Sequence, residues 1–517
     1  MRSDMRIFRL FWDFYKAVSV YVPILAVGLA VALSGVVTTD VLDGLLWLGA
    51  GGISLTFIIM LRRVFRNPPP ASHGSASFAD KSDLRRHRLL GRRGLIVGKR
   101  TWGFIRFNRD GHLLTFAPTR SGKGVGCVIP NLLDHRGSVV VTDIKGENYT
   151  ITGRWRRSFS RVYRVAPFDG HVPGSRYNPL DFIRTGCPED VDDAALIADL
   201  LVSRTGHDTF WDSEAQNLLA GLLLYAATDL SAEQRSLHGV WALLMQDQSG
   251  FDDVIARMRA SEHPAIRRAG EGFSQKEERE RSAVISTAQT HMKIWKSSRL
   301  AAATQSSDFQ MEDLKRTTMS LYIVIPPELL NVYHPFLRLM VGLSVSAMTR
   351  VPGAPKERVL FLLDEIAALG RMAPIESGIG YLAGYGVSLW LFFQDLDQIQ
   401  KTYPKWRSII ANCNVRQAFG VSDYQTAKEL SDMLGNRTVS VSSSGRSKDW
   451  LSPIPDHVHR QHSETGRPLM APDEIMVMPE REQLIFVQAC RPILARKVRY
   501  FKERLFQGRY EVWRPDL

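Results

Sequence analysis

The chain of 517 residues is 44% hydrophobic and 23% charged, a composition that excludes a disordered or fibrous protein and predicts two or three folded domains. Its four cysteines show neither C-x-x-C spacing nor a paired framework, which excludes a disulfide scaffold and predicts reduced thiols that bind no metal. The net charge of +13 is unevenly placed, because residues 62–109 alone hold thirteen Lys or Arg and only two Asp.

Two long apolar runs open the chain. Residues 17–37 carry no charge and are long enough to cross about 30 Å of hydrocarbon, and residues 44–61 form a second uncharged run. The segment between the runs holds no Lys or Arg, whereas basic residues flank their outer ends, so both chain ends are expected in the cytoplasm. A cleaved signal peptide would explain the first run alone, but the second run argues against it. We therefore expect residues 1–66 to form a two-helix transmembrane hairpin anchor.

Residues 67–110 are expected to be a linker followed by a basic juxtamembrane segment. The stretch 67–77 is rich in Pro, Ser and Gly, which is typical of a linker. The basic stretch 84–100 lies close to the predicted membrane, where anionic lipid head groups are its default partner. Nucleic-acid phosphates are the alternative, because the same charges would serve them. The residues alone leave both partners open.

Residues 111–187 begin with a strand, a glycine-bearing loop and a helix, the pattern of a nucleotide-binding domain. Gly122 and Lys123 stand where a phosphate-binding loop needs them, with backbone N–H groups around the phosphate and the lysine on the β- and γ-phosphates. Two positions depart from G-x-x-x-x-G-K-[ST]: Ala117 replaces the first glycine, and Gly124 replaces the hydroxyl residue that holds Mg²⁺. A chance Gly-Lys-Gly turn is the alternative. The residues expected to bind nucleotide are Pro118, Thr119, Arg120, Ser121, Gly122, Lys123, Gly124 and Val125.

The next segments supply further candidates. The strand 138–143 ends in Asp143, which should emerge beside the loop at the carboxyl edge of a parallel sheet. Arginines alternate with aromatic residues over 154–164, which suits a nucleic-acid or subunit contact as well as a solvated helix face. Residues 188–303 show apolar residues at helical spacing without strand-like runs, so we expect an all-helical insertion that serves as a binding module or as a lid or spacer.

Strands and helices alternate again over residues 304–517, the second part of the nucleotide-binding domain and the tail. The apolar strand 359–363 ends in Asp364 and Glu365, which can present one carboxylate to a metal and the next to a water. Gln394 ends another strand, where it could sense the γ-phosphate or simply cap the strand. Together with the loop, these residues predict nucleotide hydrolysis on an α/β P-loop NTPase fold with a mostly parallel, doubly wound sheet.

The end of the chain predicts two more features. The stretch 440–447, SVSSSGRS, indicates a flexible connection. Residues 484–488 and 493–500 indicate two last strands at the sheet edge.

Several separated motifs resemble one family in one order: APTRSGKGVGCVIPNLL, TDIKGENY, FLLDEIAALGRM and LWLFFQDLDQIQKTY. Over about residues 75–496 the chain is similar to the TraG-type coupling proteins of type IV secretion and conjugation. The resemblance implies an ATPase of the FtsK/HerA class in the bacterial inner membrane, with its ATPase domain in the cytoplasm. It also implies a homo-hexamer that receives single-stranded DNA with its relaxase, or protein effectors, and hands them to the proteins of a secretion channel.

The resemblance also assigns roles and the cofactors ATP and Mg²⁺. Lys123 would bind phosphates, Asp364 would hold Mg²⁺ through water, Glu365 would polarise the attacking water, and Gln394 would be the sensor. The Gly124 variant resembles the loop of this family. It leaves the inner-sphere metal ligand unassigned.

For that ligand Ser121 and Thr119 are only candidates. Related ring pumps insert an arginine from the neighbouring subunit, often just before the glutamine-bearing strand. Residues 372–393 hold no arginine, and Arg371 and Arg416 are the possible substitutes.

Two other functions stay open at this point. A chromosome-segregation translocase of the same ATPase class usually has more membrane spans and a C-terminal winged helix, and no such module follows residue 484. A non-motor docking receptor for secretion substrates, with a weak nucleotide site, is the second alternative. Intact Lys123, Asp364 and Glu365 argue against it.

Overall fold

The computed structural model of the chain describes residues 54, 55, 58, 71–170, 174–202, 209–446 and 458–513. The predicted membrane hairpin lies outside these residues, apart from positions 54, 55 and 58. Among the described residues, no helix combines the length and the apolarity needed to cross a bilayer. The chain divides into two compact units, residues 1–75 with 436–467 and residues 76–435 with 468–517.

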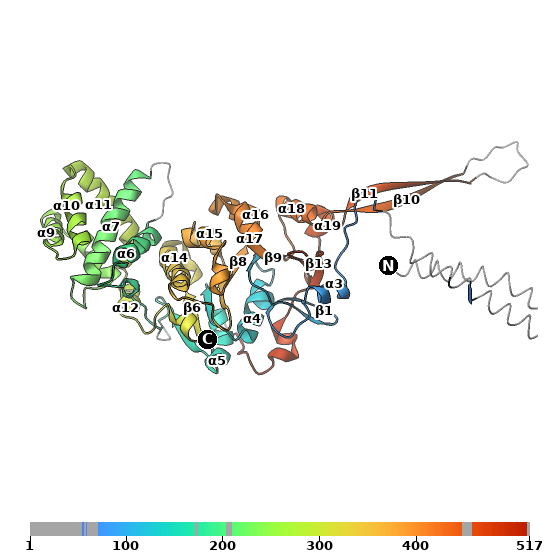
Figure 1. Ribbon diagram of the computed structural model, residues 1–517, viewed down its shortest axis with the longest axis horizontal. Helices are drawn as coiled ribbons and strands as arrows, with labels where there is room; N and C mark the ends of the chain where they lie inside the picture. The colour runs from blue at the N-terminus through green and yellow to red at the C-terminus, as the bar shows by residue number, and fades with distance from the viewer. Residues whose placement is uncertain are drawn as a thin grey trace, which may run out of the picture. The chain divides into compact units, whose positions relative to one another are not determined.

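The smaller unit contains a two-stranded sheet of β10 (Asn436–Arg446) and β11 (Val458–Pro468), drawn as a narrow pair of arrows in Figure 1. Thr438 ties β10 to the segment before the first helix, because its N–H donates to the carbonyl of Gly74 (3.0 Å) and its hydroxyl accepts from the N–H of His73 (3.0 Å). The flexible connection expected at 440–447 is therefore wrong as far as Arg446, because a strand partner takes up the backbone groups of this Ser-rich stretch.

The larger unit is built on a mixed sheet of eleven strands in the order β2-β1-β13-β12-β9-β3-β8-β7-β4-β6-β5 (Figure 1). The seven strands from β9 to β5 are parallel, and β12, β13, β1 and β2 continue the sheet in antiparallel pairs. The strand bounds are β1 Leu95–Arg100, β2 Gly103–Phe107, β3 His112–Phe116, β4 Val139–Asp143, β5 Arg161–Val165, β6 Met319–Val324, β7 Val359–Leu363, β8 Val387–Phe393, β9 Cys413–Ala418, β12 Glu482–Val487 and β13 Ile493–Arg496.

The sequence predicted the α/β class, which is confirmed, but two details of the sheet differ. The basic stretch 84–100 was expected to be a juxtamembrane segment, yet its second half is β1, whose Leu95, Ile96 and Val97 are buried in the core. Because β1 and β2 extend the sheet, the tail strands β12 and β13 lie inside it rather than at its edge.

Helices cover both faces of the sheet. Successive residues of β3 point to opposite faces, so Leu114 packs with the helices α14 to α18 while Leu113 packs with the helices after the glycine-bearing loop. The first face carries α14 Pro327–Arg350, η4 Ile366–Leu369, α15 Ala373–Gly378, η5 Leu382–Tyr385, α16 Leu396–Thr402, α17 Trp406–Asn412 and α18 Tyr424–Leu434. The second face carries α3 Lys81–Arg86, η1 Gly124–Val128, α4 Ile129–Asp134 and α5 Glu147–Arg157, and the chain also forms α19 Pro472–Met476, η6 Tyr500–Lys502 and η7 Arg504–Phe506.

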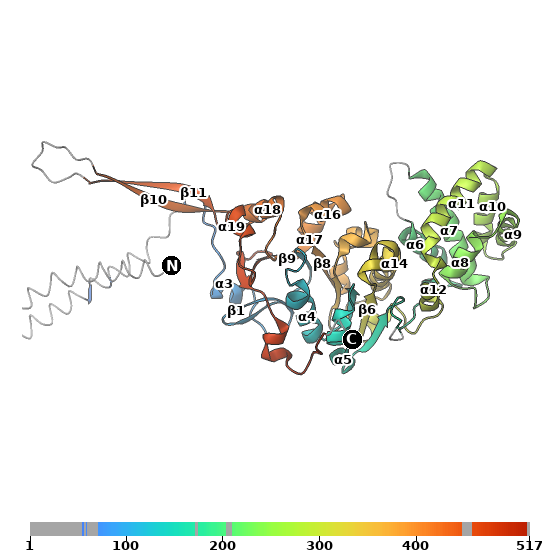
Figure 2. The same cartoon turned by 180° about the vertical axis from the view of Figure 1, so that it is seen from behind.

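The segment between β5 and β6 is helical throughout its described part, after the short η2 (Pro179–Phe182). Figures 1 and 2 show its helices gathered beyond α14 and β6 at one end of the larger unit. They are α6 Asp190–Leu201, α7 Phe210–Thr228, α8 Leu237–Leu244, α9 Gln248–Arg259, α10 Pro264–Ser274, α11 Glu278–Met292, η3 Lys293–Lys296 and α12 Ser298–Thr304, followed by α13 Asp313–Arg316.

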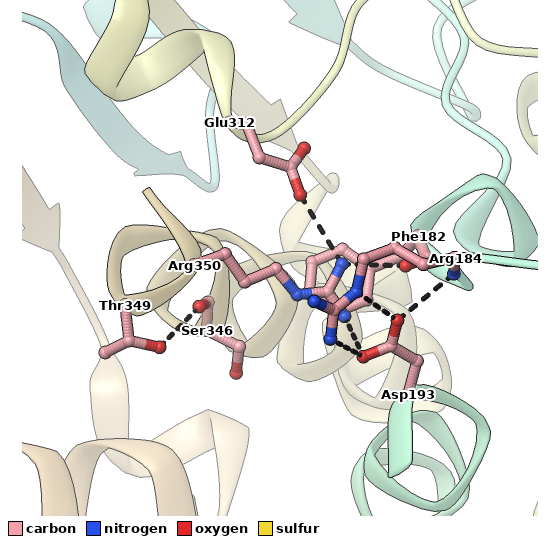
Figure 3. Close-up of polar contacts among 7 residues, drawn as sticks. All are labelled: Phe182, Arg184, Asp193, Glu312, Ser346, Thr349 and Arg350. Carbon is pink, nitrogen blue, oxygen red and sulfur yellow. Dashed lines mark hydrogen bonds and ion pairs between the residues drawn. The ribbon is translucent and has the colours of Figure 1, made fainter. Parts of the chain in front are cut away.

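A largely buried ion-pair cluster joins α6 to the end of α14 (Figure 3). Arg350, the last residue of α14, pairs with Asp193 of α6 and with Glu312 (3.4 Å), and its guanidinium donates to the carbonyl of Phe182 (2.7 Å). Arg184 binds the other side of the same Asp193 carboxylate (Nε to Oδ2, 2.9 Å). One carboxylate thus holds two arginines from different segments, which fixes α6 against the end of α14.

Arg156 is one of the arginines that alternate with aromatic residues over 154–164, and its contacts show that it has a structural role. Its guanidinium is fully buried and donates to Ser320 Oγ (2.6 Å) and to the carbonyls of Leu132 (3.1 Å), His135 (2.8 Å) and Gly137 (2.7 Å). Burial lowers the pKa of this guanidinium to about 10. The side chain caps the end of α4 and ties it to β6, so it belongs to the core rather than to a solvated face or a binding surface.

Replacement of Arg156 by Ala should therefore lower the free energy of unfolding by about 3 kcal/mol, since four buried acceptors lose their donor. The exposed Arg161 offers a matched control, and Arg161→Ala should change stability by about 0.5 kcal/mol or less. Denaturant unfolding followed by circular dichroism measures both values. Equal stability of the two variants would contradict the structural role given to Arg156.

Candidate active site

The glycine-bearing loop begins where β3 ends. The N–H of Ala117 donates to the carbonyl of Phe393 on β8 (2.8 Å), which fixes the start of the loop to the neighbouring strand. Arg120 (φ 63°) and Gly122 (φ 89°) both take the left-handed conformation, which glycine adopts without strain. The N–H of Gly126 then donates to the carbonyl of Gly122 (2.8 Å) and starts the helical turn of η1. The loop therefore reverses the chain and ends at Lys123, at the positive end of a helix.

The acid pair lies at the end of β7. The hydroxyl of Thr142, on the adjacent β4, donates to the carbonyl of Asp364 (2.9 Å). Glu365 is left-handed (φ 51°), and its N–H donates to Oδ1 of Asp364 (2.9 Å). This turn directs the two consecutive carboxylates to the same edge of the sheet, where parallel strands end.

Lys123 meets both acids. Its Nζ lies 2.8 Å from Oδ1 of Asp364 and 2.5 Å from Oε1 of Glu365. Gln394, which follows β8, donates from Nε2 to Oε2 of Glu365 (3.3 Å). The side chains of Lys123, Asp364 and Glu365 are 17%, 20% and 26% exposed, so the cluster is shielded but open to a ligand. The structure thus brings together the four residues that the sequence analysis predicted for the site. They come from the ends of three strands, β3, β7 and β8.

Burial and charge act against each other in this cluster. Burial raises the pKa of Asp364 although Lys123 opposes the shift. Burial also disfavours the charge of Lys123, but the neighbouring Asp364 and Glu365 carboxylates hold the pKa of the lysine above its ordinary value. Lys123 is therefore a protonated donor at neutral pH.

A third acid, Asp143, lies at the end of β4 at the same sheet edge. It accepts from the N–H of Tyr149 (2.9 Å) and from the amide of Asn148 (3.3 Å), and burial raises its pKa to about 6. Burial likewise raises the pKa of Glu147. Asp143 orders the start of α5 beside the site, and it has no hydrogen bond or ion pair with Lys123 in the part of the chain that the structure describes.

The donor set suits Mg²⁺ held jointly with phosphates. Among the described residues, no group of three or more His, Cys, Asp or Glu side chains could hold a metal ion by itself. Mg²⁺ commonly takes one or two carboxylates and completes its shell with water and phosphate oxygens, and Asp364 is such a carboxylate. The Ser121 hydroxyl is shielded from solvent and has no hydrogen-bond partner within the described chain, whereas Thr119 is exposed. Of the two candidate hydroxyl ligands, Ser121 is therefore the one with a shielded oxygen that makes no hydrogen bond within the described chain.

The two candidate trans-acting arginines make no hydrogen bond or ion pair with this cluster in the described part of the chain. Arg371 is 59% exposed and its Nε donates to Glu376 (2.8 Å), after η4. Arg416 lies in β9 and lines a small cavity against α18 with Leu430 and Met433. Exposure leaves Arg371 able to reach a neighbouring molecule, whereas Arg416 faces helices of its own subunit.

Lys497 is the residue of this site that sequence reasoning missed. It follows β13, and its Nζ donates to the carbonyl of Ser121 (2.9 Å), although the two residues are 376 positions apart. No motif surrounds Lys497, and only the placement of β13 within the sheet brings it to the loop. The sequence carries no local signal that could have found it.

Comparisons with known proteins place the chain in a family. A sequence profile described as type IV secretory system conjugative DNA transfer matches residues 77–514. The conjugal transfer protein TraG of Escherichia coli is 31% identical over 507 residues, which cover 86% of this chain and 79% of TraG. Protein VirD4 of Agrobacterium fabrum strain C58 is 28% identical over 480 residues, which cover 89% of this chain and 70% of VirD4.

Solved structures of the bacterial conjugative coupling protein TrwB share the fold. The unbound form of TrwBdeltaN70 is 18% identical with a TM-score of 0.63, covering 83% of this chain and 96% of the solved chain. The complex of TrwB with ADP and Mg²⁺ is 16% identical with a TM-score of 0.64, covering 84% of this chain and 96% of the solved chain. Because the profile spans most of the chain and TraG matches along most of both sequences, the resemblance seen in the motifs is confirmed, and the chain belongs to the type IV secretory system conjugative DNA transfer family, which includes TraG and VirD4.

Proposed function

We propose that the chain is a coupling ATPase that drives single-stranded DNA with its relaxase, protein effectors, or both into a type IV secretion channel. The observation that carries the proposal is the meeting of Lys123 with Asp364 and Glu365, and of Glu365 with Gln394, at the carboxyl edge of the sheet. Ligands bind at this edge in open α/β sheets. Family membership and the ADP–Mg²⁺ complex of TrwB support the choice of ATP and Mg²⁺.

The residues divide the chemistry between them. The protonated Lys123 donates to the β- and γ-phosphate oxygens, which accept as the two carboxylates do. The backbone N–H groups of residues 118–125 surround the same phosphates. Asp364 holds Mg²⁺ through water, with the Ser121 hydroxyl as a further oxygen ligand. When bound, Mg²⁺ neutralises the charge that develops on the phosphates.

Glu365 is the base in this arrangement, because it accepts the proton of the attacking water. Gln394 donates to Glu365 and so fixes the direction of that carboxylate. The glutamine sits at the end of β8, between the strands that carry Lys123 and the acids. It is therefore placed to link the state of the γ-phosphate to the position of the base.

The anchor and the assembly complete the proposal. Residues 1–66 form a two-pass anchor in the bacterial inner membrane, with both termini and the ATPase domain in the cytoplasm and anionic lipids beside the basic stretch. Six copies form a ring in which hydrolysis moves the substrate. The apolar runs and their flanking charges, together with the family, support this part.

Lys123→Ala should reduce DNA-stimulated ATP hydrolysis by about two orders of magnitude or more, because the phosphate charge loses its main donor. The exposed Lys428 of α18 provides the control, and Lys428→Ala should hydrolyse ATP at the wild-type rate. Release of inorganic phosphate measures both. Equal rates for the wild type and Lys123→Ala would favour the non-motor docking receptor instead.

Glu365→Gln should bind ATP with unchanged affinity and lose turnover by about 10²- to 10⁴-fold, because the general base is removed while the metal carboxylate stays. Calorimetric titration gives the affinity, and single-turnover hydrolysis gives the rate. Loss of nucleotide binding in this variant would show that Glu365 holds the nucleotide rather than activating water.

Removal of the residues before Asn67 should release the protein from membranes and weaken its assembly, since the apolar runs are then absent. Sedimentation of membranes from cells that express either form tests the first effect, and light scattering of the purified proteins tests the second. A truncated chain that still sediments with membranes would contradict the hairpin anchor.

A further inference from the structure

The segment after β13 reaches the phosphate-binding loop directly. The backbone N–H of Lys497 donates to the carbonyl of Arg481, just before β12 (2.8 Å), so the hairpin of β12 and β13 sets the position of the residue. Its Nζ then donates to the carbonyl of Ser121 (2.9 Å). The contact joins the tail of the chain to the turn that precedes Lys123.

Lys497 is a half-buried cation without a carboxylate partner. Its Nζ lies 4.5 Å from the centre of the Phe419 ring, and no ion pair to it occurs among the described residues. Burial lowers the pKa of this amine, and the charge of Glu480 opposes the shift only in part. Shielded charges are normally paired, because an unpaired one has lost hydration without compensation. An anion bound at the adjacent loop would supply that compensation.

The geometry of the peptide bond gives the contact a consequence for the loop. The Ser121–Gly122 peptide is planar and trans, so the Ser121 carbonyl and the Gly122 N–H point in opposite directions. A cation that holds the carbonyl therefore also fixes the direction of the N–H. It polarises the same peptide and makes the N–H a stronger donor. This matters here because glycine at position 122 leaves the backbone unusually free to rotate.

The neighbouring tail residues pack on the phosphate helix as well. Val498 lies in one core cluster with Ile129 and Leu133 of α4. The carbonyl of Val498 lies beside Gly126, where an added Cβ would be in ordinary van der Waals contact with it (3.5 Å). The tail and α4 thus pack together, and this packing holds the amine of Lys497 beside the carbonyl of Ser121.

We propose that Lys497 is a positioning residue of the nucleotide site, which holds the Ser121–Gly122 peptide in the orientation that binds phosphate and adds a second positive charge beside Lys123. The ligand class is a nucleoside di- or triphosphate. The inference rests on the proposed function, since it concerns the same site.

The test compares Lys497→Met, Lys497→Arg and the exposed tail control Lys502→Met in the full-length chain. Calorimetric titration with Mg²⁺–ADP should give a Kd about tenfold weaker, or more, for Lys497→Met, as loss of a charged hydrogen bond predicts. Lys497→Arg should recover most of the affinity, and Lys502→Met should bind as the wild type does. The melting temperature without nucleotide should be unchanged in Lys497→Met, while its rise on addition of Mg²⁺–ADP should shrink.

The outcomes distinguish a failure of the proposed function from a failure of the inference about Lys497. If the wild type binds no nucleotide, the proposed function itself fails. If the wild type binds and Lys123→Ala binds poorly, but Lys497→Met binds as tightly as the wild type, only the inference about Lys497 is overturned. If Lys497→Met melts at a lower temperature without nucleotide and Lys497→Arg restores neither property, the residue has a purely structural role, which also overturns the inference.

Discussion

The candidate active site depends on a single ammonium group shared by two carboxylates. Lys123 belongs to a loop after β3, and Asp364 and Glu365 belong to a turn after β7, with β8 between the two strands. Parallel strands end at one edge of a sheet, so only a parallel β3-β8-β7 order places these groups together with Gln394. The eleven-stranded sheet therefore serves the site by its strand order, and the remaining elements hold that order in place.

A buried polar network supports the loop from behind. The hydroxyl of Thr115, on β3, donates to Gln417 on β9 (3.0 Å), and Gln417 donates to Gln483 on β12 (3.1 Å). Asn131 of α4 exchanges two hydrogen bonds with the backbone of Ile96 on β1 (2.8 and 2.9 Å). Satisfied networks of this kind specify one arrangement of a core. The antiparallel half of the sheet thus holds α4, the helix after the glycine-bearing loop, in place.

Local pattern was sufficient for some of this structure and insufficient for the rest. The apolar runs before Phe116 and Asp364 identify fully buried strands, because every position in them faces a core. Strand β1 was missed because its Lys99 and Arg100 continue a basic stretch that also suits a membrane surface. The contact of Lys497 could not be predicted at all, since it depends on pairing between distant strands rather than on spacing. Local periodicity reports burial, but it carries no information on which strand lies beside which.

Helix α14 contacts both the turn next to the candidate active site and the helices between β5 and β6. It packs against η4, the turn that directly follows Glu365, and also against α6. At its last residue, Arg350 shares the Asp193 carboxylate with Arg184, so the contact with α6 is made by charged groups that hold one geometry (Figure 3). Closely packed interiors transmit displacement rather than absorb it. Any shift of the acid-bearing turn would therefore act on α14, which meets α6 both at the Arg350 cluster and where Arg338 donates to the carbonyl of Leu201 (2.8 Å).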